Sequence, residues 1–273
     1  MKLTFFGTAA AEGFPGVFCN CKYCIRAREL GGKNLRSRTQ ALVNDDLLID
    51  LPPCTMTHFQ QHGVRGDKLK VLLFTHGHGD HFFPNDLKLR VPPYAHEMES
   101  PALDVVCPEN VYEVCMREVG ENGGIRLHKG ELYQTLSLGG YEITPLRAKH
   151  DFGRQAFIYV IKKDGKTVLY AHDTGYFYDE VFDFIERNGL CFDFATFDCT
   201  NAHLPSDIKG SHMGFDKVGM VIERLRGMGA LREDSVLFVN HFSHNGNPLH
   251  EDMELTAAAV GCKVSYDGCS VEF

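Results

Sequence analysis

The feature that most constrains this chain is a loop in which histidines and an aspartate crowd together. Val71–Phe74 predicts a buried strand, and Thr75–His81 follows it with the order Thr-His-Gly-His-Gly-Asp-His. Neutral imidazole and carboxylate groups are ligands of divalent metal ions. The two glycines let the loop fold tightly enough for its polar side chains to converge. The loop therefore predicts a metal centre at the end of a strand.

Further ligands are expected from other parts of the chain, because one loop cannot surround an ion on every side. Three more segments place His or Asp directly after an apolar run. They are Ala148–Asp151, Tyr170–Gly175 and Val239–His241. These segments predict a site at the edge of a sheet, assembled from distant parts of the sequence.

The apolar pattern predicts an α/β chain rich in strands. Strands are predicted at Lys2–Phe6, Thr39–Val43, Leu47–Asp50, Lys70–Phe74, Tyr141–Leu146, Ala156–Ile161, Thr167–Ala171, Phe192–Phe197 and Ser235–Val239. Helices are predicted at Pro108–Val119, Tyr178–Arg187, Phe215–Met228 and Leu249–Ala259. Gly165 predicts a hairpin turn between two of the strands, because it tolerates positive φ. Strands that first pair and then alternate with helices, without a linker, favour a single domain over residues 1–273.

Composition narrows the class of partner. Asp and Glu number 36 against 28 Lys and Arg, so the net charge is −8 and long nucleic acid is not expected as a partner. No apolar run has the length of a membrane span, and we expect a cytoplasmic protein without a membrane partner. The 10 cysteines are spread through a large chain and are expected as thiols or metal ligands.

The His and Asp segments together resemble the metallo-β-lactamase superfamily, whose Thr-His-x-His-x-Asp-His motif is followed by His, Asp and His. The resemblance implies a four-layer αβ/βα sandwich with two divalent metal ions at one edge of its two sheets. It implies these ligands: for one ion His76, His78 and His150, for the other Asp80, His81 and His241, and as the bridge Asp173. Zinc or manganese is expected at these positions, and nickel and iron are alternatives.

A second motif lies near the N-terminus. Cys19, Cys21 and Cys24 resemble the structural zinc knuckle of the PhnP-type phosphodiesterases of phosphonate degradation, and of the related pyrroloquinoline-quinone biosynthesis B protein. Three thiolates leave one tetrahedral position of a zinc ion open. The resemblance assigns that position to His244, three residues after His241. The alternative is a set of three reduced thiols in the core.

The complete ligand set with a bridging Asp resembles the hydrolases of the superfamily, among them phosphodiesterases, processing nucleases and glyoxalase II. The resemblance implies attack on phosphorus by a hydroxide that bridges the two metals held by Asp80 and Asp173. It implies that His212 protonates the leaving oxygen, with His203 as the competing candidate, while Asp198 orients an active-site histidine.

We therefore expect a metal-dependent phosphodiesterase that acts on a small molecule such as a cyclic ribose phosphate or a cyclic nucleotide. A diester is favoured over a monoester, because the motif loops show no evident Arg or Lys clamp for a dianion. The alternatives are an RNA-processing nuclease, a thioester or lactone hydrolase, and a binding protein of the quinone-biosynthesis type. A homodimer is one alternative for the oligomeric state.

Overall fold

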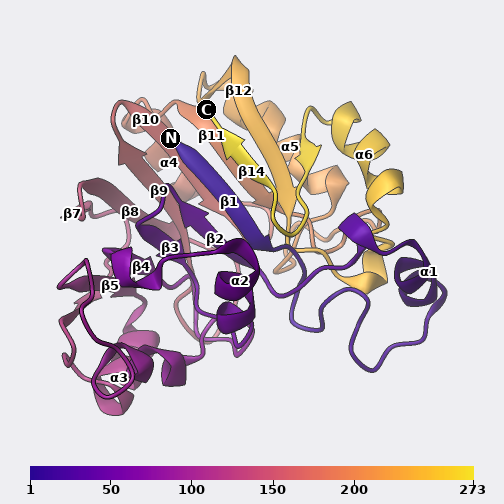
Figure 1. Cartoon of the computed structure of the whole chain (residues 1–273). Coiled ribbons are helices and arrows are strands. Elements are labelled where there is room, and N and C mark those ends of the chain that lie inside the picture. The colour runs from indigo at the N-terminus through magenta and orange to yellow at the C-terminus, as the bar shows by residue number, and fades with distance from the viewer.

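Apolar runs pair into two seven-stranded sheets in the computed structural model, which describes residues 1–273 (Figure 1). The first sheet has the order β14-β1-β2-β3-β4-β5-β6. Its strands are β1 (Lys2–Gly7), β2 (Gln40–Val43), β3 (Leu47–Ile49), β4 (Val71–Leu73), β5 (Leu103–Cys107), β6 (Ile125–Lys129) and β14 (Ser270–Glu272). The second sheet has the order β13-β12-β11-β10-β9-β8-β7. Its strands are β7 (Leu136–Leu138), β8 (Tyr141–Arg147), β9 (Phe157–Lys163), β10 (Lys166–Ala171), β11 (Phe192–Asp198), β12 (Leu231–Asn240) and β13 (Lys263–Val264).

Each sheet is antiparallel at one side and parallel at the other. In the first sheet β1, β2 and β3 pair antiparallel, whereas β3, β4, β5 and β6 pair parallel. The second sheet repeats this plan, with parallel pairs from β10 to β13. Parallel neighbours need long crossover connections, which are usually helices. This arrangement confirms the prediction that strands first pair and then alternate with helices in each half.

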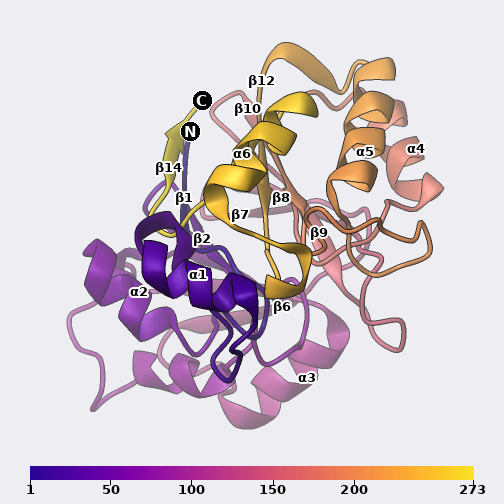
Figure 2. The ribbon, with the colours of Figure 1, turned by 90° about the vertical axis from the view of Figure 1, so that its right-hand side faces the viewer.

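Helices cover the outer faces of both sheets. They are α1 (Lys22–Leu30), α2 (Thr55–His62), α3 (Glu109–Glu118), α4 (Asp179–Arg187), α5 (Phe215–Gly227) and α6 (His250–Ala259). Figures 1 and 2 show α2 and α3 outside the first sheet and α4, α5 and α6 outside the second. The four-layer αβ/βα sandwich is therefore confirmed. No helix combines the length and apolar character that crossing a membrane requires.

The inner faces of the sheets form a shared apolar core. Phe5 of the first sheet packs in one buried cluster with Tyr159, Tyr170 and Phe194 of the second. Burying one such ring fully stabilises the fold by about 2 kcal/mol. This core fixes the two sheets against each other, so that the ends of their strands meet at one edge.

The sequence pattern missed four edge strands, one interior strand and two helices. The strands β5, β6, β7, β13 and β14 and the helices α1 and α2 were not predicted. β13 and β14 have only two and three residues, too few for an alternating pattern to stand out. α1 begins inside the cysteine motif, whose residues do not follow helical periodicity. The predicted hairpin is confirmed, with both Asp164 (φ 49°) and Gly165 (φ 73°) in the left-handed region.

Candidate metal centre

Three imidazoles converge where β4 and β8 end. His76 Nε2 lies 2.9 Å from His78 Nδ1, and His150 Nε2 lies 3.1 Å from the same His78 atom. A neutral imidazole has one ring nitrogen with a proton and one with a free lone pair. Because three such nitrogens point to one spot, a shared cation satisfies them better than hydrogen bonds among themselves. These are the side chains that the sequence assigned to the first ion.

A second group lies beside the first. His81 Nε2 is 3.3 Å from His241 Nε2 and 3.3 Å from Asp80 Oδ2. Both histidines are buried. The structure thus brings together the side chains that the sequence assigned to the second ion, although His241 lies 160 residues from His81.

Asp173 lies between the two groups. Its Oδ2 is 3.0 Å from Nε2 of both His81 and His241, and its Oδ1 is 3.6 Å from His150 Nε2. The carboxylate is buried, and its Oδ2 makes no hydrogen bond. One oxygen therefore faces each group, which is the placement that a bridging ligand requires.

Strained backbone aims these side chains. Asp50 (φ 64°), Asp173 (φ 50°) and His241 (φ 67°) all adopt left-handed conformations just after β3, β10 and β12. Such conformations cost about 1–3 kcal/mol each and are concentrated at functional sites. The packing of the two sheets offsets this conformational cost. It thereby keeps the three side chains turned toward the common edge.

The outer nitrogens of the histidines are also held. His81 Nδ1 donates a hydrogen bond to Asp50 Oδ2 (2.7 Å). The hydroxyl of Thr200 lies 2.7 Å from His241 Nδ1, and the hydroxyl of Thr75 lies 3.0 Å from His76 Nδ1. Partners of this kind fix the ring orientation and leave Nε2 free to bind a metal.

His212 borders both groups. Its ring stacks on His241, with 5.7 Å between centroids, and lies 4.8 Å from the ring of His150. Nδ1 of His212 is 2.9 Å from Oδ2 of Asp198, which is fully buried. Burial lowers the pKa of His212, but the charge and hydrogen bond of Asp198 outweigh this and raise that pKa to about 9. The predicted orienting role of Asp198 thus has a geometric basis.

The competing candidate, His203, lies elsewhere. Its ring packs 5.3 Å from that of Phe215, and its Nδ1 is 3.5 Å from the hydroxyl of Thr256 on α6. It belongs to none of the clusters that could hold a metal ion. The structure therefore brings His212, and not His203, to the site.

The cysteine motif forms a separate cluster with His244. Nδ1 of His244 lies 3.5 Å from Sγ of Cys19 and 3.6 Å from Sγ of Cys21, and Cys24 completes the group. All three thiols are free. Burial raises the pKa of Cys21, but the backbone N–H of Cys24 and the ring of His244 outweigh it and lower that pKa to about 6. A thiolate at neutral pH is the form that binds zinc.

The family model described as "Beta-lactamase superfamily domain" matches residues 48–239. The chain belongs to this superfamily. No curated protein matches the sequence.

Solved structures of the superfamily share the fold over the whole chain. A diphosphatase from the PhnP family has a TM-score of 0.77 at 19% identity and covers 100% of this chain and 97% of its own. Zn²⁺-bound PqqB from Methylobacterium extorquens has a TM-score of 0.73 at 15% identity, with 100% of both chains covered. Human tRNase Z, short form, has a TM-score of 0.65 at 14% identity, with 100% and 99% covered. The predicted membership of the metallo-β-lactamase superfamily is confirmed by the family model, and these structures share its fold.

The donor sets fit divalent metal ions. Imidazole, carboxylate and thiolate are the groups that bind such ions, and here they converge without other hydrogen-bond partners at the inner atoms. Superfamily membership and this donor set make the chain a metal-dependent hydrolase. The number and identity of the metals stay predictions.

Sequence reasoning missed Asp50, Thr200 and Asp151 as partners of the histidines. Asp50 could have been found as a carboxylate at the very end of a predicted strand, a position close to the pattern that revealed the other sites. Asp151 lies next to His150, and its Oδ2 is 3.6 Å from His78 Nε2. Thr200 offers no comparable signal, because a threonine after a strand is commonplace.

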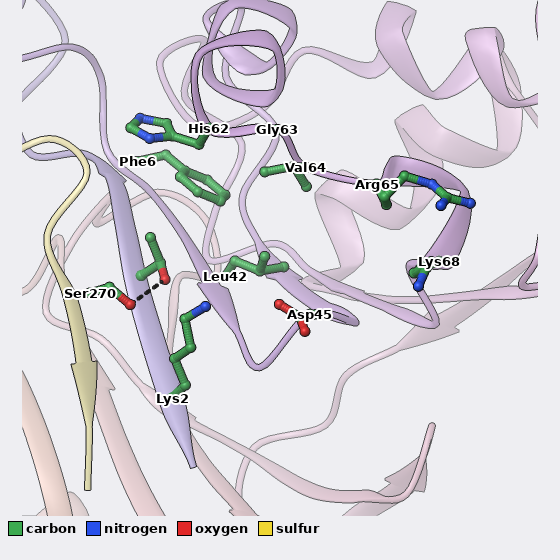
Figure 3. A pocket seen from close by; sticks show the side chains of 11 residues that line it. Lys2, Phe6, Leu42, Asp45, His62, Gly63, Val64, Arg65, Lys68 and Ser270 are labelled. Atoms are coloured by element: carbon green, nitrogen blue, oxygen red, sulfur yellow. Dashed lines mark hydrogen bonds between the residues drawn. The ribbon is translucent and has the colours of Figure 1, made fainter.

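A further hollow of about 380 Å³ lies away from this centre, on the outer face of the first sheet (Figure 3). It is lined by Lys2 of β1, Ser270 of β14 and His62 at the end of α2, among others. It contains none of the predicted site residues, and we assign it no part in the chemistry.

Proposed function

We propose that the chain is a phosphodiesterase that hydrolyses small phosphodiesters, with cyclic ribose phosphates or cyclic nucleotides as the expected natural class. The observation that carries this proposal is the pair of His212 and Asp198 beside the two ligand groups. A phosphodiester expels an alkoxide, and an alkoxide leaves slowly unless it receives a proton. Cleavage of a thioester places less demand on such an acid, because a thiolate leaves without a proton.

Each residue has a part in the proposed reaction. Two divalent ions, when bound, would activate a water molecule and offset the charge that develops on the phosphoryl oxygens. Asp173 keeps the two ligand groups together through its two oxygens. Asp198 accepts a hydrogen bond from Nδ1 of His212, so that Nε2 is the atom that delivers a proton to the leaving oxygen.

The accessibility of His212 supports this role. The side chain of His212 is 25% exposed, whereas Asp198 beneath it is fully buried. A substrate can therefore reach the imidazole, and the carboxylate stays dry. A low local dielectric strengthens the bond between the two groups and limits the ring to one orientation.

The comparisons support hydrolysis at phosphorus as the reaction class. A diphosphatase of the PhnP family is among the similar structures. Two structures of RNA-processing enzymes, human tRNase Z and a long-form RNase Z from yeast, also share the fold. The net charge of −8 favours a small substrate over RNA, because RNA binding depends on cationic surface.

The experiment that tests the proposal compares two phosphodiesters in wild-type protein and in His212→Ala. Nitrophenolate leaves without a proton, whereas the alkoxide of a cyclic ribose phosphate does not. We expect His212→Ala to slow the cyclic substrate roughly 100-fold or more, and the nitrophenyl diester by less than tenfold. Metal content should stay at the wild-type level.

His203→Ala is the matched control and should leave both rates unchanged. A selective loss in His203→Ala would transfer the acid role to that residue. Faster cleavage of a thioester or lactone than of any diester in the wild type would contradict the phosphodiesterase proposal.

A further inference from the structure

The loop that leads to His212 is supported differently at its two ends. Asp198 binds the ring of His212 and accepts a hydrogen bond from the backbone N–H of Met213 (2.9 Å), which fixes the C-terminal end. Residues 208–211, here called the approach segment, contain neither helix nor strand and are at least partly exposed. A general acid must lie within hydrogen-bond distance of the oxygen that it protonates. The approach segment therefore needs support from other parts of the molecule.

Two polar contacts join the approach segment to the loop between β8 and β9. Nζ of Lys149 donates a hydrogen bond to the carbonyl oxygen of Ile208 (3.2 Å). Nδ1 of His150 lies 3.4 Å from the carbonyl oxygen of Ser211. The ammonium of Lys149 also lies 4.7 Å over the ring of Tyr178, which holds it at this position. The approach segment thus rests on the loop that carries one of the metal-ligand candidates.

The third contact is a close approach of two backbones. Gly175 follows the bridging candidate Asp173 by two residues and packs against the carbonyl group of Gly210. A Cβ atom on Gly175 would overlap the oxygen of that carbonyl and would lie only 2.9 Å from its carbon. The φ angle of Gly175 lies outside the left-handed region, so glycine is needed here for space and not for backbone freedom.

The segment that carries Gly175 is the more rigid partner in this contact. Thr174 and Gly175 are buried, and the N–H of Gly175 donates a hydrogen bond to the carbonyl of Lys149 (3.1 Å). The hydroxyl of Thr174 accepts a hydrogen bond from the backbone N–H of Lys149 (2.9 Å). The approach segment is more exposed, so it is the part that should move when the contact is disturbed.

We propose that Gly175 and Lys149 are positioning residues that place the imidazole of His212 for proton transfer, by holding the approach segment against the two metal-ligand loops. This inference rests on the proposed function, because it concerns the acid of that reaction. Neither residue contacts the reacting atoms, and each acts through the backbone that precedes His212. The two metal-ligand loops thereby set the distance between the acid and the metal centre.

Gly175→Ala tests the close approach. The added methyl group should displace the approach segment, and a displacement of about 1 Å at a catalytic group can cost roughly 100-fold in rate. We expect kcat for the cyclic ribose phosphate to fall roughly 100-fold, and kcat for the nitrophenyl diester by less than about tenfold, because nitrophenolate needs no proton. KM values and metal content should stay at the wild-type level. Gly227→Ala, at the end of α5, adds a methyl group in open space and is the matched control.

Lys149→Met tests the hydrogen bond. Methionine keeps an unbranched apolar stem but removes the donor to Ile208, so we expect kcat to fall roughly tenfold on the cyclic substrate alone. Lys149→Arg keeps a donor and should restore most of the lost rate. Lys129→Met removes an exposed lysine of β6 and is the control. A loss of positioning, unlike general structural damage, should leave Tm and the nitrophenyl rate near their wild-type values.

Two outcomes would overturn the inference. Equal losses on both substrates with a lower metal content would show that the segment of Asp173 moves in place of the approach segment. Wild-type selectivity between the two substrates in both Gly175→Ala and Lys149→Met would show that neither residue positions the acid.

Limited proteolysis separates this inference from the proposed function. Trypsin cleaves after lysine, and Lys209 is an exposed residue of the approach segment. In the metal-loaded protein, we expect cleavage after Lys209 to be several-fold faster in both variants than in the wild type, with cleavage at other sites unchanged. That result supports the contacts even if no phosphodiester is hydrolysed. If the wild type hydrolyses the cyclic substrate through His212 and both variants match it in rate and in cleavage, the inference fails and the proposed function stands.

Discussion

At the scale of single residues, the orientation of the histidines depends on partners behind them. Asp50 is fully buried and accepts hydrogen bonds from His81 Nδ1 and from the backbone N–H and hydroxyl of Thr75. One carboxylate thereby fixes both the start of the metal loop and its last ligand. Its position after β3 explains why a short strand ends in a strained conformation.

Asp50→Asn tests this role. The amide keeps the shape of the side chain but loses the charge that orients the His81 ring, and removal of such a partner typically weakens metal affinity or activity by 10–100-fold. We expect a loss of this size in kcat and a lower content of one active-site metal, measured by elemental analysis.

Asp183→Asn on the surface of α4 is the control for Asp50→Asn and should change neither quantity. Wild-type metal content and activity in Asp50→Asn would show that the loop holds His81 without the carboxylate.

The sequence predicts residues better when their chemistry is local. The crowded loop after β4 and the Cys-x-Cys-x-x-Cys pattern can be recognised as metal-site candidates from the sequence alone. Few functions other than metal binding need those residues so close together. Asp50 and Thr200 were missed because their partners lie 31 and 41 residues away in the sequence, and only the fold brings them together. The choice of His212 over His203 likewise needed the fold.

At the scale of elements, the cysteine cluster joins the N-terminal segment to the segment after β12. Cys19 and His244 are 225 residues apart, and Glu12 also bonds Ser243 next to His244 (2.6 Å). A zinc ion in this cluster would stabilise the connection between chain ends, since metal binding to a folded site adds to folding free energy.

His244→Ala and His241→Ala should therefore have opposite effects. We expect His244→Ala to lower Tm by roughly 5–10 °C through loss of the structural zinc, while the active-site metals are largely kept. His241→Ala should lose an active-site metal and activity with a much smaller change in Tm. Calorimetry together with elemental analysis distinguishes the two. Wild-type Tm in both variants would contradict the assignment of His244.

The predicted elements were most reliable where apolar periodicity is long. The helices α3, α4, α5 and α6 were each predicted with their bounds at most one residue off. In β6 apolar residues alternate with basic ones, and β7 has only three residues, so neither strand shows a distinct apolar run. These two strands lie at the sheet edges, where less burial is required of the side chains.

At the scale of the molecule, the two sheets turn separate sequence motifs into one centre. Ligand candidates follow β4, β8, β10 and β12, and the shared core between the sheets brings the ends of these strands to one edge. The order of the motifs predicted the fold through its resemblance to a family. The sheet topology gives the physical reason why the motifs converge on one centre. Single-domain organisation, oligomeric state and substrate stay predictions of this account.

The most direct test of the central claim is metal analysis combined with phosphodiester hydrolysis. We predict about three metals per chain, two of them removed by mild chelation, because a cluster with three thiolates retains zinc more strongly than His and Asp ligands do. Hydrolysis should stop when the two leave and return when Zn²⁺ or Mn²⁺ is added back. Full hydrolysis after loss of the two metals would contradict the account.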